Sequence, residues 1–171
     1  MKKSLIVVSL GLSAVLMSGA YAQHGHGHAH GHAVSTQVSS EKGTRNVAID
    51  QCWIRLMPSG TPSGGFFNLK NNDASQIAVL KAIETDAFEE VMLHRSYTRD
   101  GQSGMEMVPE VIVKAGETLH FEPGGFHAML EKPVSGLKAG DKIQAVFILG
   151  TGDKLPVTCE LKPINARSFD S

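Results

Sequence analysis

Aromatic residues, cysteine and net charge are all scarce in this sequence of 171 residues. Aromatic side chains make up 6% of it, cysteine occurs twice, and 16 basic residues nearly balance 17 acidic ones. This balance gives no reason to expect binding to nucleic acid or to an anionic membrane. The length suits one domain with a core of its own, and the composition excludes collagen, a polytopic membrane protein and a fully disordered chain.

Motifs of the common catalytic classes are also missing. The sequence contains no G-x-S-x-G, no H-E-x-x-H, no phosphate-binding glycine loop followed by lysine, and no dinucleotide-binding fingerprint. A blue-copper electron carrier needs a cysteine thiolate with two histidines and a methionine, and neither Cys52 nor Cys159 stands near a suitable histidine. We therefore expect neither an enzyme nor a thiolate-bound copper centre.

The first 22 residues have the pattern of a secretory signal peptide. Two lysines precede an apolar stretch at 4–17, and Ala20-Tyr21-Ala22 matches an A-x-A cleavage site. The apolar stretch is short for a membrane span, so we expect cleavage before Gln23 rather than a retained anchor. The mature protein is then exported, has no membrane span and folds where thiols can oxidise.

A histidine-rich tract follows the expected cleavage site. Five of the eight histidines stand within nine residues and alternate with glycine or alanine, so this stretch has no apolar side chains for a core. Neutral imidazoles bind Cu(II) or Zn(II), and we expect a secondary metal-binding tract and linker over 23–45. A solvated linker is the alternative. The histidines are His24, His26, His28, His30 and His32.

From about residue 46 the sequence changes to short hydrophobic segments with turn signals between them. No sustained helical period occurs there, and eight or nine short strands with regular turns predict an all-β, Ig-like sandwich or a barrel. We place this domain at 46–163 and a C-terminal tail at 164–171. The expected strands are 47–56, 65–69, 77–84, 90–97, 105–113, 118–122, 126–130, 142–149 and 155–162.

Two histidines and two methionines are the strongest candidate metal ligands. His127 and Met129 are two residues apart on an expected strand, so they point to the same face. His94 and Met105 flank a turn signal, so a hairpin can bring them together. Two thioethers with two imidazoles form a soft ligand set that suits Cu(I) and is poor for Mg²⁺ or Ca²⁺.

The register of this hairpin is open at this stage. Pairing His94 with Met105 requires a four-residue loop, whereas a tight turn at Asp100-Gly101 places Met107 opposite His94. Met107 shares a face with Met105 and is the reserve ligand. A methionine on a strand ordinarily fills the core, which is the alternative for each candidate.

Four other sulfur-containing side chains have structural explanations. Met57 and Met92 are assigned to packing. Cys52 and Cys159 each alternate with apolar residues, so both should point inward, and an exported chain with two cysteines favours a disulfide between them. Two separate buried thiols are the alternative, because the first and last strands of a sandwich need not bring the Cα atoms within bonding range.

The spacing of the four candidate ligands resembles the motif of the periplasmic copper chaperones called PCu(A)C. His94 and Met105 are separated by ten residues, Met105 and His127 by twenty-one, and His127 and Met129 by one. The segments 123–130 and 136–141 are also similar to that family, and the resemblance covers about 47–162. Arg95 stands where many members have a second methionine.

This resemblance implies a cupredoxin-like β-sandwich that binds one Cu(I) through the four residues. It also implies delivery of Cu(I) in the periplasm to apo copper sites of cytochrome oxidase subunits, alongside Sco-type proteins. A periplasmic copper- or zinc-buffering or tolerance protein, which acts mainly through the histidine tract, is the first alternative. A copper oxidase or monooxygenase is the second.

Overall fold

The computed structural model describes residues 46–171, and its regular elements in that range are ten β-strands. This range contains no helix long and apolar enough to span a membrane. The expected signal peptide and the histidine tract both lie outside the described residues. The strands are β1 (Val47–Arg55), β2 (Ser63–Asn71), β3 (Ala78–Glu84), β4 (Phe88–Arg99), β5 (Gln102–Met107), β6 (Val111–Val113), β7 (Thr118–Phe121), β8 (Phe126–Pro133), β9 (Lys142–Leu149) and β10 (Lys154–Lys162).

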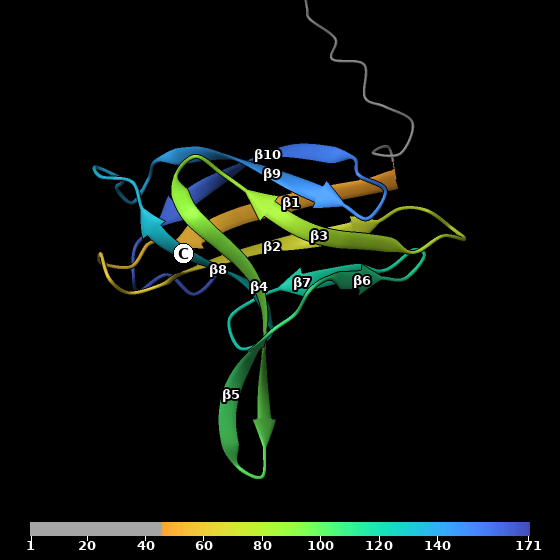
Figure 1. Cartoon of the computed structure of the whole chain (residues 1–171), viewed down its shortest axis with the longest axis horizontal. Helices are drawn as coiled ribbons and strands as arrows, with labels where there is room; N and C mark the ends of the chain where they lie inside the picture. Colours follow the sequence, from red (N-terminus) through yellow and green to blue (C-terminus); the bar gives the residue numbers. More distant parts are fainter. Residues whose placement is uncertain (1–45) are drawn as a thin grey trace, which may run out of the picture. The chain divides into compact units, whose positions relative to one another are not determined.

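The strands form one hydrogen-bonded sheet in the order β5-β4-β8-β7-β2-β1-β10-β9-β3-β6, with an additional pairing between β8 and β2. Side chains of β4 and β8, near one end of this order, share one hydrophobic cluster with side chains of β3 and β9, near the other end. The sheet therefore folds over on itself around a common core (Figure 1). The all-β sandwich predicted from the sequence is confirmed, with ten strands in place of eight or nine.

The additional strand arises where one long strand was expected. The segment 105–113 is divided into the end of β5 and the whole of β6, with Pro109 between them. Proline has no backbone N–H to continue a ladder, so the strand ends there. Figure 1 shows that β5 and the end of β4 form a hairpin that projects beyond the other strands.

Large apolar side chains fix how the strands lie against one another. Phe67 on β2 stacks on Phe121 of β7, with ring centroids 4.1 Å apart, and meets Phe147 of β9 edge-on at 4.8 Å. All three rings are buried. Because side chains alternate along a strand, the neighbours of Phe67 on β2 must face outward. The core therefore sets which residues of β2 reach the outer face.

A disulfide joins the first and last strands. Cys52 on β1 and Cys159 on β10 are bonded, with their Cα atoms 4.6 Å apart, and both are buried in the core. The two strands also pair in parallel, with Trp53 opposite Glu160. The structure thus has the disulfide and not the two separate thiols that were the alternative.

The C-terminal segment (163–171) packs on the outer face of β1 and β2, although its last eight residues were expected to be a tail. Ala166 is 4% exposed and clusters with Trp53, Phe66 and Phe169. The Trp53 and Phe66 rings lie 4.5 Å apart beneath it. The C-terminal segment therefore covers the Trp53 and Phe66 rings on the outer face.

Candidate metal centre

The four predicted copper ligands come from three adjacent strands, β5, β4 and β8. His94 on β4 lies directly opposite His127 on β8, with ring centroids 5.8 Å apart. Met129 on β8 lies opposite Met92 on β4, and Met105 is on β5. Directly opposed residues share a face, as do residues two apart on a strand. All four candidates are therefore on one face of the sheet.

The hairpin has the tight-turn register, so pairing of His94 with Met105 is wrong. Met107 lies directly opposite His94, and Met105 lies opposite Ser96. The turn residues Asp100 and Gly101 have φ angles of 52° and 76°. Two positive φ angles are typical of the two-residue turn that matches the twist of paired strands, which explains why this turn replaces a four-residue loop.

A surface cavity of about 400 Å³ lies on this face of the sheet. Met105, His127 and Met129 line it, and Ser96 contributes to its wall. His94 is absent from the lining but stands beside His127. Three of the four predicted ligands thus surround one space, and the fourth adjoins it.

A backbone hydrogen bond orients His127. Its Nδ1 lies 3.1 Å from the carbonyl oxygen of Gly125, and since a carbonyl can only accept, Nδ1 donates. This leaves Nε2 with the free lone pair that a metal needs, an arrangement typical of metal-binding histidines. The same carbonyl accepts the N–H of Ser96 at 3.1 Å, so it also ties β4 to the site.

His94 has no hydrogen-bond partner. Both of its ring nitrogens are buried and unpaired, which is costly for a polar group. A bound metal ion would satisfy one of them, so the ligand set fits a soft cation. Burial lowers the pKa of His94 below its ordinary value of 6.5, and the neighbouring His127 lowers it further. His94 therefore stays neutral and able to bind metal at a lower pH than an ordinary histidine.

Two methionines assigned to packing also lie at this site. Met57 lines the cavity, and Met92 is opposite Met129 on the same face as His94. Alternation along the strands could have placed Met92 there, since it is two residues before His94. Met57 follows the end of β1, where no strand pattern could place it.

Sulfur is essential to any soft metal site in this region. Within residues 46–171, no group of three or more His, Cys, Asp or Glu side chains could hold a metal ion. Both cysteines are in the disulfide and supply no thiolate. The two exposed thioethers of the hairpin, Met105 and Met107, are 60% and 66% exposed. Thioethers and imidazoles together favour Cu(I).

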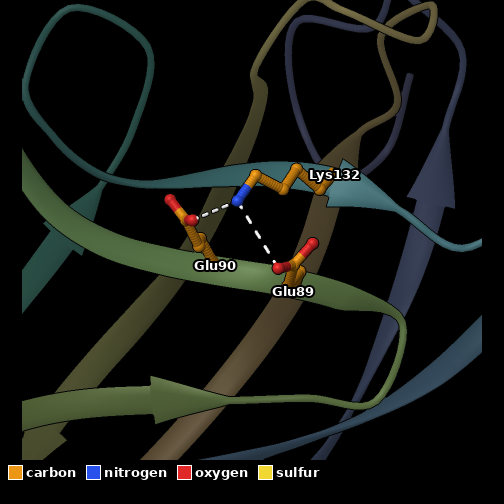
Figure 2. A network of polar contacts seen from close by, with 3 residues as sticks. All are labelled: Glu89, Glu90 and Lys132. Carbon is orange, nitrogen blue, oxygen red and sulfur yellow. Dashed lines mark hydrogen bonds and ion pairs between the residues drawn. The ribbon is translucent and has the colours of Figure 1, made fainter.

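Ion pairs beside the site also link β4 to β8. Lys132 on β8 reaches both Glu89 and Glu90 on β4, as Figure 2 shows. The hydrogen bond to Glu90 raises the pKa of Lys132, and the Glu89 carboxylate adds to this effect. These contacts are exposed and contribute little stability, but they agree with the register that aligns His94 and His127.

Some residues of the site carry no signal in the sequence. The Gly125 carbonyl belongs to the backbone, so its role depends on the turn that precedes β8. Arg55 and Phe66 line the cavity from β1 and β2, and neither has a motif that marks it. The secondary tract from His24 to His32 lies outside the described residues, so its metal binding stays a prediction.

Comparison with known proteins gives a family and a fold. The family model described as "Putative lipoprotein LpqE-like" matches residues 47–161. The putative lipoprotein Lxx21020 of Leifsonia xyli subsp. xyli is 30% identical over 122 residues, which are 71% of this chain and 72% of that protein.

Solved structures with the same fold include copper-bound forms. The apo PCuAC domain of PmoF2 matches with a TM-score of 0.60 at 14% identity, over 72% of this chain and 94% of that one. Copper-bound forms of the PmoF2 domain and of DR1885 from Deinococcus radiodurans, the latter with Cu(I), each match with a TM-score of 0.58. DR1885 is 23% identical over 77% of this chain and 87% of its own.

These matches confirm the resemblance seen in the sequence. The family model covers most of the strands, and the structures reproduce the sandwich that carries the candidate site. The chain belongs to the LpqE-like family, and its described domain has the fold of the PCuAC domains.

Proposed function

We propose that this protein is an exported copper chaperone whose domain binds one Cu(I) through His94, Met105, His127 and Met129. The observation that carries the proposal is that Met105, His127 and Met129, from β5 and β8, line one cavity, while His94 on β4 lies directly opposite His127. The absence of a carboxylate or thiolate cluster in the described residues favours a soft, monovalent ion. The copper-bound PCuAC structures of the same fold support it.

The arrangement suits uptake and release. His127 is held by the Gly125 carbonyl with Nε2 free. Burial lowers the pKa of His94, so this imidazole need not lose a proton before copper binds near neutral pH. The hairpin methionines are exposed, so an incoming ligand can displace one thioether at a time. Neutral ligands leave the positive charge of copper uncompensated, which favours its transfer to the thiolates of a partner.

We propose the periplasm as the compartment, after cleavage of the signal peptide, and apo copper sites of cytochrome oxidase subunits as acceptors. Sco-type proteins are the proposed partners in this transfer. None of the proposed steps needs a general acid, a general base or a nucleophile, so the proposed role is not enzymatic.

A transfer assay tests this function. The Cu(I)-loaded full chain is mixed under anaerobic conditions with the apo copper domain of an oxidase subunit, the two are separated, and copper is measured in each. We expect copper to move to the acceptor, and the Met105→Ala/Met129→Ala chain to bind Cu(I) much more weakly than the parent. Copper that stays on the donor would favour the buffering alternative, in which replacing the five tract histidines should remove most of the binding capacity.

A further inference from the structure

Arg55 lies in the same line of directly opposed residues across the sheet as Met129, a predicted copper ligand. It is opposite Gly64 on β2, and Gly64 is opposite Met129 on β8. Directly opposed residues share a face, and adjacent strands are about 4.8 Å apart, so the Arg55 and Met129 backbones are about 10 Å apart. Both residues line the same cavity.

Aromatic rings and the C-terminal segment hold the Arg55 side chain in place. Its guanidinium carbon lies 5.6 Å from the centre of the Trp53 ring and 5.2 Å from that of Phe66. Its Nε donates a hydrogen bond of 2.8 Å to the carbonyl oxygen of Ala166. Gly64 makes room for this arrangement, because a Cβ there would come within 2.8 Å of the Phe66 ring.

The charge of this guanidinium is not neutralised nearby. The ion pairs found among residues 46–171 do not include Arg55. The described residues that line the cavity include no carboxylate and no lysine, and Arg55 is the one arginine among them. A copper ion in the cavity would therefore meet a fixed positive charge.

We propose that Arg55 increases the preference of the cavity for Cu(I) over Cu(II), in addition to the preference of the thioether and imidazole ligands. This inference rests on the proposed copper site. The repulsion from one fixed charge is twice as large for Cu(II) as for Cu(I). With the backbone spacing of about 10 Å taken as the separation between the guanidinium and the copper, and an effective dielectric constant of about 20, the difference is on the order of tenfold in relative affinity.

The C-terminal segment acts on the site through Arg55. Its Ala166 carbonyl anchors the Nε, and Ala166 and Phe169 cover the rings on which the guanidinium stacks. Arg55 is thus a specificity-determining residue, and the segment 163–171 positions it.

The reduction potential of bound copper tests the inference. The parent is the full chain with the five histidines of the 24–32 tract replaced by asparagine, so that Cu(II) reports on the domain. We expect Arg55→Met to lower the midpoint potential by about 60 mV, which corresponds to a tenfold relative gain for Cu(II). Arg55→Lys keeps the charge and should retain most of the parent potential. Arg55→Gln gives a second neutral variant if Arg55→Met fails to fold.

Arg99→Met is the matched control. Arg99 also stacks on an aromatic ring, that of Tyr97 at 5.3 Å, but it is near the hairpin turn and outside the cavity lining. Its removal should leave the potential unchanged. A potential that does not change in Arg55→Met, or that falls equally in Arg55→Lys, overturns the proposal for Arg55.

A different experimental result would overturn the proposed function. If the parent keeps its Cu(I) when Met105 and Met129 are both replaced by alanine, the copper site is wrong and the Arg55 proposal falls with it. If that double variant loses Cu(I) while Arg55→Met leaves the potential unchanged, the proposal for Arg55 alone is overturned.

Discussion

Met107 lies directly opposite His94 across the β4–β5 ladder, two residues further along β5 than the methionine selected by the family spacing. Met105, which has that spacing, lies opposite Ser96 and lines the cavity. Both thioethers are exposed and on the same face as His94. The hairpin therefore offers two sulfur ligands to one site.

We predict that Met105 and Met107 partly replace each other. Met105→Ala and Met107→Ala should each weaken Cu(I) affinity by about tenfold. The double variant should weaken it by far more than the product of the two single effects, because no hairpin sulfur then remains. Competition with a chromophoric Cu(I) chelator measures this. Met57→Ala is the control for loss of a cavity-lining methionine. If Met107→Ala has no effect in either background, Met107 is not a ligand.

Acid should destabilise the apo domain through His94. Its folded-state pKa is below the ordinary 6.5, so an unfolded chain binds a proton that the folded one resists. Stability should therefore decline as the pH falls below about 6.5, down to the folded-state pKa. Thermal unfolding of the apo protein across this range measures the decline. His94→Leu should make it shallower; an unchanged slope would rule out His94 as the cause.

Removing the disulfide should cost much stability but little copper affinity. The bond closes a loop with a sequence separation of 107, which stabilises the fold by about 5 kcal/mol in the chain-entropy model. We expect the Cys52→Ala/Cys159→Ala chain to have a melting temperature lower by about 10 °C or more. Its Cu(I) affinity at 20 °C should match the parent, since neither cysteine is a proposed ligand. Two alkylated cysteines in the unreduced parent, detected by mass spectrometry, would refute the bond.

Two glycines near the site should respond differently to alanine. Gly64→Ala puts a Cβ 2.8 Å from the Phe66 ring, so the ring must move and overpacking should cost about 1–3 kcal/mol. Gly125→Ala meets its nearest atom at 3.5 Å, an ordinary contact, and keeps the carbonyl that orients His127. Chemical denaturation compares them. Equal losses would mean that the Phe66 ring is not constrained as described.

Local patterns predicted much of the fold and the set of candidate ligands. The alternation of His127 with Met129 placed both on one face, and the turn at Asp100-Gly101 marked the hairpin. Its register stayed open because two loop lengths fit the same residues, and only the geometry of the turn decides between them.

Long-range contacts could not be predicted in the same way. Arg55 is near Met129 because β2 pairs with both of their strands, and Ala166 contacts Arg55 although the two residues are 111 positions apart in the sequence. No local pattern encodes such a meeting. The division of segment 105–113 into two strands at Pro109 could have been predicted, since a proline inside an expected strand indicates an interruption of that strand.

Because of the bond between Cys52 and Cys159, the stability of the domain depends on whether its compartment is reducing or oxidising. In a reducing cytosol the two cysteines remain thiols, and β1, which carries Arg55, loses its covalent link to β10. A chain in that compartment is then the less stable form. Under the proposed export, oxidation of the two cysteines completes the fold, so the proposed carrier would mature only in the compartment proposed for delivery of its cargo.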